Sequence, residues 1–183
     1  HQRRTFRWMG GIIALMFGVW MASKGQEGTQ DRVYIFPGIE NVDIARVHIQ
    51  DGNSSLSVVR IEQGWGLVGH DDYEVDYASF ESLLNNLLEA SRSPSLNTND
   101  ATPYGLQPPQ LKITLVENSG KDHLLKIGNP LQVSTDTYIS HDAAIYTTSG
   151  NLAQDWRTAV NSIRSKAKSN TEEGSVQPTA VTP

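Results

Sequence analysis

Residues 46–61, RVHIQDGNSSLSVVRI, decide the fold of this chain. Polar and apolar residues alternate before the Asp-Gly-Asn-Ser-Ser segment and again after it, which is the pattern of two half-buried strands joined by a tight turn. A second turn at 63–64 leads into a short third strand at 65–68. The sequence therefore predicts an antiparallel sheet that grows strand by strand along the chain.

An amphipathic helix is expected over residues 77–90, after a polar segment at 69–72 that we expect to be a loop. Asp76 is the expected N-cap and Pro94 the stop, because proline cannot continue a helix. The apolar side chains of this segment recur at helical spacing and define one buried face. They are Phe80, Leu83, Leu84, Leu87 and Leu88.

The second half of the chain repeats this order after a connector at 95–109 that is rich in Asn, Thr and Pro. A final helix is expected over 151–166, with Leu152, Trp156, Val160 and Ile163 on one face. The fold class is α+β, an antiparallel sheet with two amphipathic helices on one face, and it is compatible with a duplicated β-hairpin–helix unit. Strands of the second half are expected at 111–116, 123–127, 137–140 and 144–147.

Charge is distributed unevenly along the 183 residues, which carry a formal net charge of −5. Residues 1–25 hold four basic residues and no acid, and the remainder holds 11 basic and 20 acidic residues. A folded body this acidic argues against a nucleic-acid partner. The absence of cysteine excludes disulfides, Cys-ligated zinc and iron–sulfur clusters.

An uncharged apolar segment at 8–22 predicts a single transmembrane helix. With its flanks it reaches 18 residues, roughly 27 Å at about 1.5 Å per residue, which is close to the hydrocarbon thickness of a bilayer. A cleaved signal peptide and a buried helix of a soluble core are the alternatives. The expected anchor residues are Trp8, Ile12, Ile13, Leu15, Phe17 and Trp20.

Arg3, Arg4 and Arg7 precede this segment, and only Lys24 follows it closely. The positive-inside rule then places the N-terminus in the cytoplasm and the body outside the bacterial inner membrane, in the periplasm or extracellular space. We expect four parts: the basic flank and anchor at 1–25, a tether at 26–32, an extracytoplasmic domain at 33–166 and a polar tail at 167–183.

Three basic residues, Arg164, Lys166 and Lys168, lie where the last helix is expected to end. Positive charge at a helix C-terminus complements the helix dipole, which is the favoured explanation of this cluster. Contact with lipid headgroups is the alternative.

Residues suited to catalysis or metal binding are few, and no catalytic residue, metal or cofactor is expected. His70-Asp71-Asp72 and His141-Asp142 are the local clusters with metal-binding chemistry, but their spacing does not match a known ligand pair. The acidic run at Asp71, Asp72, Glu74 and Asp76 fits the start of a helix better than acid–base catalysis. No nucleophile elbow, phosphate loop or dinucleotide fingerprint occurs.

A distinctive string, YGLQPP, occupies residues 104–109. With the Gly64-Trp65 pair, the Ile127-Gly128 pair and the N-terminal anchor, it resembles an uncharacterised bacterial family of membrane-anchored domains of unknown function. Members of that family are often associated with gliding-type ABC transport systems, and the resemblance brings no catalytic residues. The family-motif residues are Trp65, Tyr104, Gly105, Leu106, Pro108 and Pro109.

Together these features predict a non-enzymatic, single-pass accessory subunit. Its partners would be the lipid bilayer and an integral membrane protein complex, contacted through the transmembrane helix and the extracytoplasmic domain. A transporter and a respiratory or photosynthetic assembly fit equally well. The alternative is an extracytoplasmic small-molecule or glycan-binding module built on Trp65, Tyr73, Tyr77 and Tyr104.

Overall fold

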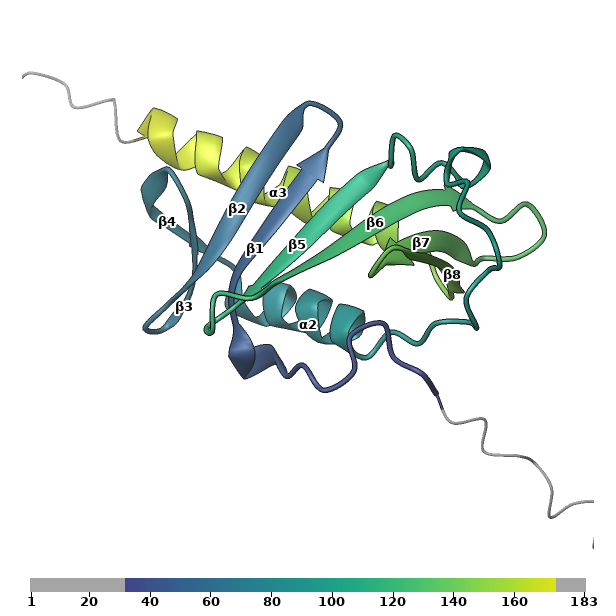
Figure 1. Cartoon of the computed structure of the whole chain (residues 1–183). Coiled ribbons are helices and arrows are strands. Elements are labelled where there is room, and N and C mark those ends of the chain that lie inside the picture. The colour runs from purple at the N-terminus through teal and green to yellow at the C-terminus, as the bar shows by residue number, and fades with distance from the viewer. Residues whose placement is uncertain (1–31, 174–183) are drawn as a thin grey trace, which may run out of the picture. The chain divides into compact units, whose positions relative to one another are not determined.

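The computed structural model describes residues 32–173, with the side chains of residues 71, 72 and 170–173 left aside. Within this range the chain forms one eight-stranded antiparallel sheet in the order β4-β3-β2-β1-β5-β6-β7-β8 (Figure 1). Two α-helices and two 3-10 turns, η1 (Asn41–Asp43) and η2 (Thr102–Tyr104), complete it. The strands are β1 (Ile44–Asp51), β2 (Ser54–Ile61), β3 (Gly64–Leu67), β4 (His70–Val75), β5 (Leu111–Glu117), β6 (Asp122–Pro130), β7 (Thr137–His141) and β8 (Ala144–Thr148).

The predicted hairpin is confirmed as β1 and β2. Val47 lies opposite Val58, and Ile49 lies opposite Leu56, so the apolar residues of the two strands share one face. This register follows from the period of two along a strand, because a slip of one residue would turn the apolar side chains to the other face.

The element order is the same in both halves of the described chain. Four strands in sequence are followed by a helix, α2 (Tyr77–Leu88) in the first half and α3 (Leu152–Glu173) in the second. The two four-stranded units join edge to edge through antiparallel pairing of β1 with β5. The α+β class with an antiparallel sheet is thereby confirmed.

Both helices pack on the same face of the sheet (Figure 1). The indole of Trp65 on β3 meets the ring of Phe80 on α2 at 5.0 Å, and Phe80 meets Trp156 on α3 at 6.2 Å. Both indoles are fully buried. Each buried large apolar side chain contributes about 1.5–3 kcal/mol of transfer free energy, so this aromatic row joins the helices firmly to the sheet.

Two local expectations were wrong. The loop expected at 69–72 overlaps strand β4 (His70–Val75), which forms because Tyr73 and Val75 are buried and the strand pairs with β3. The last helix continues beyond residue 166 to Glu173, since Ala167, which is 3% exposed, extends its buried stripe by another turn.

The expected anchor at 8–22 and its arginines lie outside the described residues, as does the end of the expected tail. Among residues 32–173, no helix is long and apolar enough to cross a membrane.

Candidate functional site

The sheet face opposite the two helices is covered by neither of them (Figure 1). Side chains that alternate with the buried ones point to this side, and they are half-buried or exposed. We define the open face by three rows of residues aligned across the strands. The rows are Glu74, Gly66, Val59, Arg46, Val116 and Asp122; Ser57, His48, Thr114 and Leu124; and Ser55, Gln50, Lys112, Lys126 and Ser140.

The open face carries three basic side chains, Arg46, Lys112 and Lys126, and two acidic ones, Glu74 and Asp122. Lys112 lies directly opposite Lys126 across the β5–β6 pair, an arrangement of like charges that destabilises a sheet. Arg46 and these two lysines have no ion pair within the described part of the chain. The open face therefore keeps a cost in free energy that a partner with negative charge would relieve.

The YGLQPP string covers one end of the open face. The Tyr104 ring lies 4.7 Å from the ring of Tyr138 on β7, and Leu106 is 1% exposed. Leu106 packs over Gly128 of β6, where an added Cβ would come within 3.0 Å of the Leu106 Cγ and would also clash with the Tyr104 carbonyl oxygen. The string is thus a plug on the sheet rather than an exposed binding loop.

The plug and the residues around Gly128 fit each other at a second point. Gly105 has a φ of +67°, and a Cβ there would overlap the side-chain amide of Asn129. The Gln110 Nε2 donates to Asn129 Oδ1 at 2.8 Å, which holds that amide in place. The YGLQPP string and the Ile127-Gly128 pair with Asn129, which are separate in the sequence, therefore form the two sides of one packing contact.

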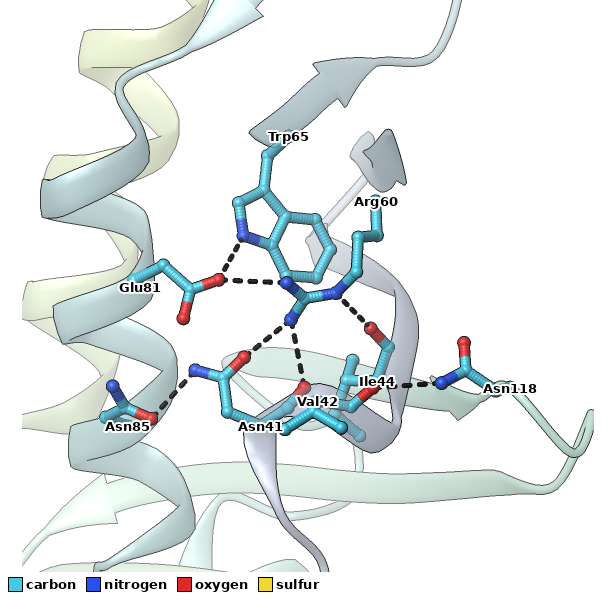
Figure 2. Close-up of polar contacts among 8 residues, drawn as sticks. All are labelled: Asn41, Val42, Ile44, Arg60, Trp65, Glu81, Asn85 and Asn118. Atoms are coloured by element: carbon cyan, nitrogen blue, oxygen red, sulfur yellow. Dashed lines mark hydrogen bonds and ion pairs between the residues drawn. The ribbon is translucent and has the colours of Figure 1, made fainter. Parts of the chain in front are cut away.

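On the helix-covered face of the sheet, a polar network joins strands β2 and β3 to α2 (Figure 2). Figure 2 shows the Arg60 guanidinium stacked on the Trp65 indole, with its Cζ 4.2 Å from the ring centroid. Its Nη1 lies 3.2 Å from Glu81 Oε1, the same oxygen that accepts the Trp65 indole N–H at 2.8 Å. Its Nε and Nη2 donate to the carbonyls of Ile44 and Asn41. Trp65, one of the family-motif residues, is therefore a structural anchor.

The four aromatic residues considered for ligand binding do not converge. Trp65 is fully buried, Tyr104 packs on the open face, and Tyr77 is 54% exposed on α2. Tyr73 borders a small hollow of about 80 Å³ between β4, α2 and α3. Burial raises the pKa of its hydroxyl, and the negative charge of Asp76 adds to that shift. No aromatic pocket unites these rings.

The two His–Asp segments also lie apart. His70 starts β4 and His141 ends β7, strands separated by six strand spacings, or roughly 29 Å at about 4.8 Å each. His141 Nδ1 donates to the Leu124 carbonyl at 3.2 Å, and its Nε2 lies 3.3 Å from Asp142. Residues 32–173 contain no group of three or more His, Asp or Glu side chains that could hold a metal ion, as far as those side chains are described.

Asp76, at the expected helix start, has a structural role. The Asp76 carboxylate accepts the Ser79 backbone N–H at 2.9 Å and caps α2 as predicted, and hydrogen bonds from Ser79 lower the pKa of Asp76. In the β5–β6 hairpin, His123 Nε2 donates to Glu117 Oε1 at 2.6 Å. This hydrogen bond, together with one from Ser119, holds the pKa of Glu117 below its ordinary value.

Sequence comparison places the chain in a family without assigning it an activity. No curated protein and no solved structure matches it significantly. A family model described as a domain of unknown function (DUF4340) matches residues 65–182, about two thirds of the chain. The match begins at the buried Trp65 and includes the YGLQPP plug, so the chain belongs to the DUF4340 family.

Proposed function

We propose that this protein is a non-enzymatic accessory subunit, anchored in the bacterial inner membrane by its N-terminal segment, with its α+β domain on the outer side. In this proposal the domain docks through the open face onto a larger membrane protein complex, either a transporter or an energy-transducing assembly. The resemblance to domains that accompany ABC transport systems is the reason for including a transporter among these candidates.

The observation that carries the proposal is the unpaired positive charge of the open face. Solvated sheet faces are common, but like charges directly opposite each other are unfavourable. Here Lys112 and Lys126 oppose each other, and Leu124 beside them is 42% exposed. An exposed apolar side chain beside two lysines without ion partners matches a docking patch for an acidic partner surface.

Charge reversal at Lys126 tests this role without harming the fold. Lys126→Glu places a carboxylate opposite Lys112 and turns a repulsive pair into an attractive one, so the domain should be at least as stable as the unmodified protein. The matched control is Lys121→Glu, the same substitution at an exposed position just before β6.

Membranes from cells that express each variant are extracted in mild detergent, and proteins that co-purify with the tagged full chain are quantified. We expect partner subunits to co-purify with the unmodified protein and with Lys121→Glu, and to be reduced about tenfold with Lys126→Glu. Isolation of the unmodified chain alone would refute the accessory-subunit role. Equal recovery with all three proteins would refute docking through the open face.

A further inference from the structure

A groove of about 330 Å³ lies beside the edge of the open face, between the C-terminal part of α3 and the strands β2 and β3. Figure 1 shows this end of α3 beside β2 and β4, and the Arg164 Nη2 joins the two sides by donating to the Ser55 carbonyl at 3.2 Å. Its volume falls within the lower range of small-ligand sites. The groove is lined by Ser55, Leu56, Ser57, Leu67, Val68, His70, Arg164, Ala167 and Lys168.

Basic side chains line this groove, and none of the lining residues whose side chains the structure describes is a carboxylate. Arg164 and Lys168 are four residues apart on α3, so they share one side of the helix. His70, at the start of β4, is exposed and faces the same groove. Neither Lys168 nor His70 forms an ion pair with any side chain that the structure describes.

The helix dipole does not account for these charges. α3 ends at Glu173, and its last turn contains no basic residue. Arg164 and Lys168 therefore lie before the turn in which dipole complementarity is effective. The helix-dipole explanation that the sequence favoured for this basic cluster therefore does not hold for Arg164 and Lys168, which line the groove.

The floor of the groove is apolar. Leu56 and Leu67 are each 7% exposed, whereas Val68 at the rim is 53% exposed. A guanidinium and an ammonium above such a floor suit a ligand with an anionic head and an apolar portion, since Arg binds phosphate oxygens in a bidentate fashion and Lys acts as a point charge.

We propose that this groove binds a phosphate group carried by an amphiphile, with Arg164 and Lys168 as the phosphate ligands, His70 as a third donor and Val68 in contact with the apolar portion. A phospholipid headgroup and a soluble phosphate monoester share this chemistry. The proposal does not depend on the accessory-subunit function, because none of these side chains belongs to the open face except Ser55 and Ser57 at the groove's edge.

Calorimetric titration of the full chain in a neutral detergent tests the site with three probes. Dihexanoyl phosphatidic acid carries both the phosphate and the apolar chains, sn-glycerol 3-phosphate carries the phosphate alone, and dihexanoyl phosphatidylcholine has the chains with a zwitterionic head. The variant is Lys168→Gln, and the matched control is Lys166→Gln. Lys166 lies two residues away on the same helix but borders the separate hollow that contains Asp76.

We expect phosphatidic acid to bind and Lys168→Gln to weaken it about tenfold, the effect of losing one charge-assisted hydrogen bond, while Lys166→Gln leaves binding unchanged. Comparable binding of glycerol phosphate would identify a soluble phosphate monoester as the source and would overturn the contact of an apolar portion with Val68, whereas binding of phosphatidic acid alone would identify a lipid. Equal binding of phosphatidylcholine, an equal effect of both substitutions, or no binding of either phosphate probe would overturn the proposal.

Discussion

Replacement of Arg60 by methionine should destabilise the domain more than any other single charge removal on the sheet. Methionine keeps the apolar stem of the side chain, but it loses the hydrogen bonds to Ile44, Asn41 and Glu81 and the stacking on Trp65. The carbonyls of Ile44 and Asn41 would then lose the donor that satisfies them.

The magnitude follows from the burial of this network. A hydrogen bond to a charged group contributes about 1.5–3 kcal/mol when it is shielded, but the Arg60 and Glu81 side chains are 28% and 16% exposed, so water replaces part of the loss. We expect Arg60→Met to lower the free energy of unfolding by about 3 kcal/mol. Glu81→Gln, which retains an acceptor for the Trp65 N–H, should cost about 1 kcal/mol.

Urea unfolding of the full chain, followed by far-ultraviolet circular dichroism, measures these values. The double variant Arg60→Met/Glu81→Gln should be more stable than the sum of the single effects by about 1 kcal/mol, because the two residues interact directly. Arg46→Met is the matched control on the neighbouring strand: it has no ion pair in the described structure and should change stability by no more than about 0.5 kcal/mol. A loss below about 1 kcal/mol at Arg60, or an equal loss at Arg46, would refute the role assigned to the network.

Two further predictions concern the YGLQPP plug and the hydrogen bond between Glu117 and His123. Gly128→Ala should destabilise the domain by about 2 kcal/mol because the added Cβ displaces the plug. Gly64→Ala is the control and should be tolerated, since its Cβ meets only an ordinary contact at 3.8 Å. Equal urea midpoints for the two variants would contradict the packing contact between the plug and Gly128. Because the pKa of Glu117 is lowered in the folded state, its contribution to stability is complete above its ordinary pKa of 4.5 and is lost as the pH falls through the folded-state value. Glu117→Gln should therefore reduce the pH dependence of the free energy of unfolding in that acidic range, and an unchanged dependence would show that the hydrogen bond to His123 does not matter.

Local patterns were sufficient for the elements with strong periodicity. The hairpin at 46–61 and the helix around Phe80 and Leu84 formed as predicted, because alternation and helical spacing report directly which side chains are buried. Strand β4 was missed because its polar residues dominate the composition, and its strand conformation depends on pairing with β3, a contact that no local pattern reports.

The candidate sites depend on register and packing, which the sequence alone did not reveal. Lys112 and Lys126 are 14 positions apart, and only the pairing of β5 with β6 makes them direct neighbours on the open face. The groove beside Lys168 exists because α3 continues past its expected end and passes β2.

The sequence by itself determined the fold class, the amphipathic helices and the uneven distribution of charge, since each of these follows from the order of apolar and charged residues along the chain. Tertiary structure alone decided that YGLQPP and the Gly128 region form one contact, and which basic residues share a surface. The physical reason is that strand pairing and helix packing bring together residues that are distant in the chain, and such proximity is not encoded in any single window of sequence.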